Sequence, residues 1–136
     1  MGPSKIHFES LTKTISEFLP KEALCVEPQS SVLDVVKAMR KKNRGCALIV
    51  EEDKLLGIFT QRDALEKVAL PGVDAREIQI QYLMTLSPEV LEESDHLAFA
   101  INKMAVGNFR HVPIRKEDGS FSVVSVRDVI RSFVQK

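Results

Sequence analysis

The sequence predicts a mixed α/β fold of the α+β class, made of two copies of one unit with the order strand, helix, strand, strand, helix. The chain aligns with itself without a gap, so that residues 26–65 lie on residues 91–130. Each copy has an apolar stripe with helical spacing, then two short apolar runs, then a second helical stripe. One such unit leaves an apolar sheet face open, so we expect the copies to pack sheet to sheet.

The repeat rests on identical and conservative pairs. Identical pairs are Glu27/Glu92, Met39/Met104, Asn43/Asn108, Ile49/Ile114, Glu52/Glu117, Asp53/Asp118, Arg62/Arg127 and Asp63/Asp128. Conservative pairs such as Ile58/Val123 fall between them, and Ile15 meets Ile80 upstream. This even distribution favours a true duplication over accidental similarity.

An amphipathic helix follows the leading strand of each copy. Ser30 or Ser31 can cap the first helix by accepting a hydrogen bond from its first turn, and Asp95 is expected to cap the second. The apolar stripes are Val32, Val35, Val36 and Met39 in one helix and Leu97, Ala100, Ile101 and Met104 in the other.

Two short strands around an acidic turn come next. The expected strands are residues 46–50, 55–59, 111–114 and 121–124. A closing helix then begins at Thr60-Gln-Arg-Asp63 in the first copy and at Ser125-Val-Arg-Asp128 in the second.

We divide the chain into a lead segment (1–11), a first repeat (12–70), a connector (71–79) and a second repeat (80–136). Pro71-Gly72 breaks the first closing helix and begins the connector. Residues 15–19 and 80–84 match one another, and we call them the lead-in segments. Each is expected to belong to the repeat that follows it.

Composition argues against several classes of protein. The 136 residues include 19 Lys+Arg and 19 Asp+Glu, a balance that disfavours a generic nucleic-acid surface. Cys25 and Cys46 form no CxxC motif and the three histidines are scattered, so we expect reduced thiols and no metal site. No apolar run is long enough for a membrane span or a secretory signal, which favours a cytoplasmic protein.

Enzyme motifs are also missing from the sequence. It contains no GxSxG, P-loop, HExxH or dinucleotide fingerprint. We therefore predict that the chain is not an enzyme and holds no catalytic cofactor.

The paired motifs Thr60-x-x-Asp63 and Ser125-x-x-Asp128 have two interpretations. In a capping box, the hydroxyl of the first residue accepts a hydrogen bond from the backbone N–H of the acid three residues later, and the carboxylate of that acid accepts one from the backbone N–H of the first residue. In a binding site, the helix N-terminus attracts phosphate while the carboxylate accepts hydrogen bonds from ribose hydroxyls. The two roles can coexist in the same residues.

This pattern resembles a tandem pair of cystathionine-β-synthase (CBS) domains, or Bateman module, over about residues 12–134. The residues that carry the resemblance are Ile80-Gln-Tyr-Leu-Met-Thr85, Arg110-His-Val-Pro-Ile114 and Leu56-Gly-Ile-Phe-Thr-Gln-Arg-Asp63. It implies two repeats related by a pseudo-twofold axis, with clefts between them for AMP, ADP, ATP or S-adenosylmethionine. It also implies a homodimer that senses this ligand and regulates an effector protein.

The resemblance implies two ligand sites in the clefts between the repeats, each with the motif of one repeat. Asp63 and Asp128 correspond to the ribose-binding acid, Thr60 and Ser125 to the hydroxyl near the phosphate, and Arg110 and His111 to phosphate-facing residues. The remaining lining residues are Ile15, Val26, Ala47 and Leu48 for the first site and Ile80, Thr85, Leu91, Val112 and Pro113 for the second. Ordinary sheet core is the alternative for each apolar one.

The two repeats depart differently from the family pattern. The first repeat lacks a proline at the position that matches Pro113, and it has Gly45 and Cys46 where the second has the basic residues Arg110 and His111. The second has Ser122 where the first has Gly57, which can crowd the close approach of a ligand. We therefore rank the Asp63 site slightly ahead of the Asp128 site.

Two other functions compete with ligand sensing. One is a dimerisation scaffold that binds no ligand. Candidate dimer contacts are Val35, Met39, Val68, Ala100, Met104 and Phe133, with intramolecular core as the alternative. The other is nucleic-acid binding, for which the only signal is a basic run over residues 37–44, and a solvated helix end explains that run better.

Overall fold

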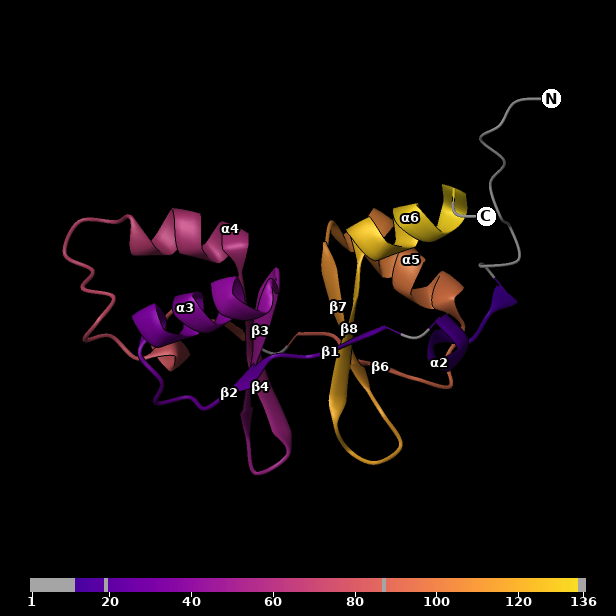
Figure 1. Ribbon diagram of the computed structural model, residues 1–136, viewed down its shortest axis with the longest axis horizontal. Helices are drawn as coiled ribbons and strands as arrows, with labels where there is room; N and C mark the ends of the chain where they lie inside the picture. The colour runs from indigo at the N-terminus through magenta and orange to yellow at the C-terminus, as the bar shows by residue number, and fades with distance from the viewer. Residues whose placement is uncertain (1–11, 19, 87, 135–136) are drawn as a thin grey trace. The chain divides into compact units, whose positions relative to one another are not determined.

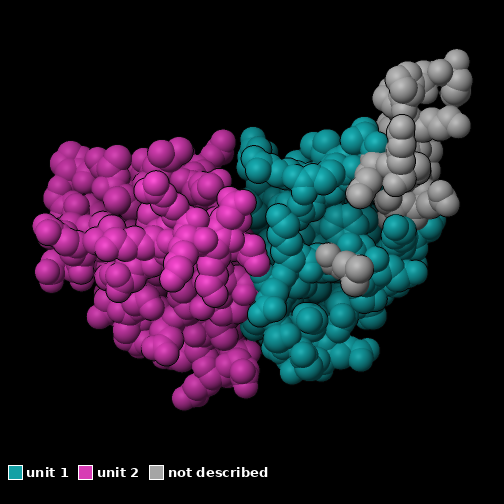
Figure 2. Space-filling model, viewed as in Figure 1, with its two compact units in different colours: residues 1–22, 89–136 teal, residues 23–88 magenta. Residues whose placement is uncertain are grey.

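The computed structural model describes residues 12–18, 20–86 and 88–134, and its helices and strands are drawn in Figure 1. The chain forms two compact units, coloured separately in Figure 2. The central unit comprises residues 23–88, and the terminal unit combines the chain up to Glu22 with the chain from Glu89 onward. Each unit contains one four-stranded sheet, which confirms the mixed α/β class.

The central unit follows the predicted element order. Its elements are β2 (Cys25–Val26), α3 (Val32–Lys42), β3 (Cys46–Glu51), β4 (Lys54–Thr60), α4 (Gln61–Asp63), the π-helical turn η1 (Ala64–Val68), the 3-10 turn η2 (Ile80–Tyr82) and β5 (Thr85–Leu86). The sheet order is β2-β3-β4-β5, with β2 parallel to β3 and the other neighbours antiparallel. Helices α3 and α4 cover one face of this sheet (Figure 1).

The terminal unit repeats this plan. Its elements are α2 (Ile15–Phe18), β1 (Lys21–Glu22), β6 (Leu91–Glu92), α5 (Leu97–Gly107), β7 (His111–Arg115), β8 (Phe121–Ser125) and α6 (Val126–Val134). The sheet order is β1-β8-β7-β6, with β6 parallel to β7. Helices α5 and α6 pack on one face of the sheet (Figure 1).

Helix ends explain part of the sequence repeat. Ser31 caps α3, because its hydroxyl accepts from the backbone N–H of Asp34 at 3.1 Å. Helices α3 and α5 end at Asn43 and Asn108, whose φ angles of 53° and 58° lie in the left-handed region. Asparagine tolerates that conformation better than most residues, so the identical pair reflects a shared helix stop.

The predicted cap at Asp95 is wrong. The Asp95 carboxylate accepts from the backbone N–H of Glu92 at 2.8 Å and closes the turn after β6. Helix α5 begins after His96, which makes no side-chain cap. Its first amide, that of Leu97, donates instead to the carbonyl of Lys13 at 2.8 Å. A backbone carbonyl from the lead-in region therefore replaces a side-chain cap.

The two lead-in segments are exchanged relative to our expectation. The Ile15 N–H donates to the Asp95 carbonyl at 2.8 Å, and the Ile80 N–H donates to the Ser30 carbonyl at the same distance. Strand β1 then pairs with β8, and β5 pairs with β4. Each lead-in segment therefore completes the unit built from the other repeat, because its edge strand extends that repeat's last strand. The compact units differ in this respect from the predicted repeats 12–70 and 80–136.

The cores follow the same exchange. Ile15 is fully buried with five core residues of the second repeat and Val129 of its closing helix. Ile80 is fully buried with Val32, Met39 and Phe59 of the first repeat. Burial of one such side chain contributes roughly 1.5–3 kcal/mol. The lead-in segments therefore hold an essential part of each core.

The predicted dimer contacts are largely intramolecular. Val35, Met39 and Ala100 are buried in the two cores, and the remaining three candidates pack partly against them. Different apolar side chains are exposed on α5 and α6, namely Phe99, Val106, Ile130 and Val134. The stripes that define the helices in sequence thus face the sheets, as amphipathic packing requires.

Replacing Ile15 with alanine tests the exchange. We expect a loss of about 2–5 kcal/mol in the unfolding free energy, because a fully buried side chain is truncated. Hydrogen exchange should rise mainly in residues 97–133, since Ile15 packs with that repeat. Leu65→Ala, at an apolar position that is 78% exposed and lies outside α5 and α6, is the matched control and should change little. Loss of protection centred on residues 32–59 would contradict the exchange.

Candidate functional site

The candidate site lies where the last long strand of each unit turns into the closing helix. In the central unit the Gln61 N–H donates to the Gly45 carbonyl at 3.1 Å. In the terminal unit the Val126 N–H donates to the Arg110 carbonyl at 2.9 Å, at the matching positions of the repeat. The duplicated motif is therefore held in the same backbone frame twice.

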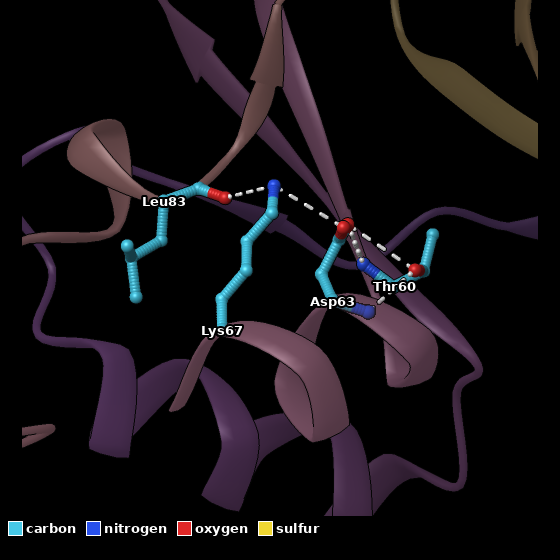
Figure 3. Close-up of polar contacts among 4 residues, drawn as sticks. All are labelled: Thr60, Asp63, Lys67 and Leu83. Carbon is cyan, nitrogen blue, oxygen red and sulfur yellow. Dashed lines mark hydrogen bonds and ion pairs between the residues drawn. The ribbon is translucent and has the colours of Figure 1, made fainter. Parts of the chain in front are cut away.

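Thr60 and Asp63 form a complete capping box. The Thr60 hydroxyl accepts from the Asp63 N–H at 3.1 Å, and the Asp63 Oδ2 accepts from the Thr60 N–H at 2.9 Å. The Thr60 hydroxyl lies 3.2 Å from the same Oδ2 and donates to it. Figure 3 shows these contacts at the start of α4. The structural role predicted for the motif is thus present in the central unit.

Lys67 occupies the other carboxylate oxygen of Asp63. Its Nζ lies 3.2 Å from Asp63 Oδ1 and donates to the Leu83 carbonyl at 2.8 Å (Figure 3). Leu83 belongs to the second lead-in segment, so Lys67 links that segment to the motif. The Asp63 residue as a whole is only 8% exposed, and both of its carboxylate oxygens already contact donors of the chain.

Asp128 has a different environment. Its backbone N–H donates to the Ser125 hydroxyl at 3.2 Å, but the reciprocal half of the box is missing. Lys21 Nζ and Arg131 Nη1 lie 3.9 and 3.7 Å from Asp128 Oδ1, beyond hydrogen-bond range. Within the described residues, the Asp128 carboxylate therefore accepts no hydrogen bond while two cations face it.

His111 lies beside this carboxylate. It pairs with Ser125 across the β7–β8 ladder, and its Nδ1 is buried without a hydrogen-bond partner in the described parts of the chain. Burial lowers the pKa of His111, the nearby Arg110 lowers it further, and Asp128 opposes the shift. Arg110 itself is exposed and immediately precedes β7. Asp128, His111 and Ser125 thus form one polar cluster in the terminal unit.

The predicted lining residues divide between the two faces of each sheet. Side chains alternate along a strand, so Ala47 faces the helix-side core while Leu48 points the opposite way, toward the face of Thr60. In the terminal unit Val112 faces the core and Pro113 shares the face of His111. Val26 and Leu91 pack against the helix-side cores as well. The core alternative therefore describes these four: Val26, Ala47, Leu91 and Val112.

The predicted lining residues Ile15, Ile80 and Thr85 come from the two lead-in regions of the chain. Ile15 belongs to the core of the terminal unit and Ile80 to the core of the central unit, so each lies in the unit that does not carry the motif it was assigned to. Thr85 is exposed on β5 and pairs with Ile58 of the central unit. The exchange of the edge strands, β1 to β8 and β5 to β4, places these three residues in those units.

Gly57 is explained by the same strand. A Cβ atom at this position would lie 2.6 Å from the Met84 sulfur and 2.7 Å from the Thr85 carbonyl oxygen. The close approach that we attributed to a ligand is therefore made by the lead-in backbone. In the terminal unit Ser122 occupies the matching position, and its buried hydroxyl has no partner among the described residues.

Sequence reasoning missed three charged residues near the motifs. Lys67 was visible as a lysine four positions after Asp63, a spacing that places both on one helix face. Arg131 stands three positions after Asp128. Lys21 gave no signal, because it comes from the lead-in region of the other repeat. The described residues contain no group of three or more possible metal ligands, and none of their helices is long and apolar enough to cross a membrane.

The buried imidazole predicts a specific pH dependence. Because the folded protein holds the pKa of His111 below its ordinary value near 6.5, the unfolded chain binds more protons as the pH falls below that value. The unfolding free energy should therefore decrease with acidification in this range. His111→Gln should flatten this decrease in urea unfolding measured from pH 7.5 to 5. An unchanged slope would show that His111 is not buried in its neutral form.

Comparison with known proteins agrees with the geometry. The chain matches the CBS domain family over residues 15–70 and 75–135. It is 34% identical over 119 residues to the CBS domain-containing protein CBSCBSPB1 of Arabidopsis thaliana, a match that covers 86% of this chain and 22% of that one. Against CBSX3, a mitochondrial protein of the same plant, identity is 30%, covering 78% and 54%. The chain thus spans roughly a fifth and a half of these relatives.

Solved structures share the fold. The CBS domain protein NE2398 superposes with a TM-score of 0.79 at 24% identity, covering 88% of this chain and 96% of that one. PAE2072 from Pyrobaculum aerophilum, complexed with AMP, gives a TM-score of 0.76 at 22% identity, covering 91% and 100%. CBSX2 in complex with AMP gives 0.73, also at 22% identity, covering 90% and 96%. With two matched copies covering most of its length, the chain belongs to the CBS domain family.

Proposed function

We propose that this protein is a regulatory sensor that binds an adenine nucleotide or related adenosyl ligand, such as AMP, ADP, ATP or S-adenosylmethionine, at the Asp128 motif. The observation that carries the proposal is the polar cluster in the terminal unit. There a carboxylate without hydrogen bonds from the described residues stands beside a helix N-terminus and several basic side chains.

The chemistry of this cluster suits a nucleotide. An unoccupied carboxylate can accept hydrogen bonds from the two vicinal hydroxyls of a ribose. The start of α6, a helix of nine residues, carries partial positive charge that favours phosphate. Lys21, Arg131 and Arg110 add exposed cations, and the side chains of the first two are 52% and 60% exposed. The buried His111 nitrogen offers one more polar contact.

The comparisons support the ligand class. Two proteins of the same fold, PAE2072 and CBSX2, are known in complex with AMP. Their identity to this chain is low, so the assignment of AMP or another adenosyl ligand here rests on the Asp128 chemistry. It makes the protein a binding module and not an enzyme, and the cytoplasmic location expected from the sequence stays a prediction.

Regulation would follow from a shift in conformational population. A ligand bound at Asp128 would replace the contacts that Asp128 makes with Lys21 on β1 and Arg131 on α6. It therefore favours whichever arrangement of these elements fits it best, by no more than its differential affinity for the two arrangements. An effector protein that contacts these elements would sense the change.

A second candidate function is a dimerisation scaffold. The observation that favours it is the set of exposed apolar side chains on α5 and α6, including Phe99 and Ile130, which are 54% and 57% exposed. Such a surface suits contact with a second copy of the chain. We propose a homodimer through these helices, which is compatible with ligand sensing.

A thermal-shift titration separates the two functions. AMP, ADP, ATP or S-adenosylmethionine should raise the melting temperature with concentration, by an amount equivalent to about 2.7 kcal/mol at a hundredfold excess over Kd. Asp128→Ala should remove the response because it removes the ribose acceptor. Asp34→Ala, at an exposed acid in the first turn of α3, is the matched control and should retain it. No response to any of the four ligands would leave only the scaffold.

A further inference from the structure

The two copies of the motif share a backbone frame but differ in what their carboxylates already hold. We infer that Lys67 closes the Asp63 site, so that the protein binds one adenosyl ligand per chain, at Asp128, and not two. This inference rests on the proposed function and names the residue that makes its two sites unequal.

The Asp63 carboxylate has little hydrogen-bonding capacity left for a ligand. A carboxylate offers about four lone-pair positions. Three donors already contact Asp63, namely the Thr60 N–H, the Thr60 hydroxyl and Lys67 Nζ, at 2.9, 3.2 and 3.2 Å. A ribose diol brings two hydroxyl donors, and one remaining position cannot accept both. Ligand binding at Asp63 would require at least one internal contact to break.

Lys67 is also held by two different elements of the central unit. Its ammonium also donates to the Leu83 carbonyl at 2.8 Å, so it bridges the closing helix and the lead-in segment (Figure 3). Displacing Lys67 from Asp63 therefore also disturbs a contact that anchors the lead-in segment, beyond the cost of separating opposite charges. The cations beside Asp128, in contrast, lie at 3.7 and 3.9 Å on exposed side chains.

Exposure does not account for the difference between the sites. The side chains of Asp63 and Asp128 are 12% and 15% exposed, which are similar values. The sites differ in the residue four positions after the acid, which is Lys67 in the central unit and Ser132 in the terminal unit. The Ser132 hydroxyl donates to the Val129 carbonyl at 2.7 Å within its own helix and does not donate to Asp128. Among the differences between the two copies, Lys67 in place of a serine is the one that brings an ammonium within hydrogen-bond distance of the acid.

Variants that swap the identities of Lys67 and Ser132 test the inference, and their AMP binding is measured by calorimetric titration. Wild type should bind one AMP per chain, and Asp128→Ala should bind none. Lys67→Ser, which gives the central unit the residue of the terminal one, should bind two. Asp63→Ala added to Lys67→Ser should return the value to one. Lys67→Met, which keeps the apolar stem, replaces Lys67→Ser if circular dichroism shows that the latter is unfolded.

Two further variants complete the design. Ser132→Lys should place an ammonium four residues after Asp128 and weaken AMP binding by at least tenfold. Lys37→Ser removes an exposed lysine from α3 and is the matched control for the loss of charge, so it should keep one site.

The outcomes distinguish the two levels of the proposal. Two sites in wild type, or one site in both Lys67 variants, would overturn the closing role of Lys67 while leaving the sensor function intact. Weaker total binding in Lys67→Ser would make Lys67 a ligand contact and would also overturn the inference. AMP binding in none of the proteins would overturn the sensor function, and the closing role with it.

Discussion

The exchange of the lead-in segments is the constraint on which the rest of the structure depends. Each segment supplies a fully buried isoleucine to the other repeat's core. The residues that flank the segment supply a carbonyl for the first amide of that repeat's helix and an edge strand for its sheet. Backbone hydrogen bonds and apolar burial act together here, because the edge strand fixes the register that directs the isoleucine into the core. Neither predicted repeat contains its whole unit, because the central unit continues past residue 70 to residue 88 and the terminal unit includes the chain up to Glu22.

The same exchange shapes the two candidate sites. It brings Lys21 toward Asp128 in one unit and the Leu83 carbonyl toward Lys67 in the other. A motif that is duplicated in sequence thus acquires two electrostatic environments. Asp63 serves the fold as a capping residue and ion-pair partner, whereas Asp128 keeps its hydrogen-bonding capacity. The original ranking of the Asp63 site ahead of the Asp128 site does not fit this distribution of contacts.

Local patterns predicted the elements well, because helical stripes and apolar runs report which face of an element is buried. The duplication predicted the matching junctions at Thr60 and Ser125. Predictions failed where a segment distant in sequence packs against the element. The Lys13 carbonyl takes the place of the cap predicted at Asp95, and β5 lies too close to Gly57 for a side chain there. The family pattern could not separate Ala47 from Leu48, since neighbouring strand residues point to opposite faces. Only the register of β3 with β4 divides them.

One measurement joins the fold to the function most directly. Amide chemical shifts of the isotope-labelled protein can be followed while AMP is added. The account predicts that the first changes occur together at residues 125–131, at His111 and at Lys21, because the exchanged lead-in strand belongs to the same site as Asp128. Changes confined to residues 58–68, with Lys21 and Asp128 unaffected, would contradict it.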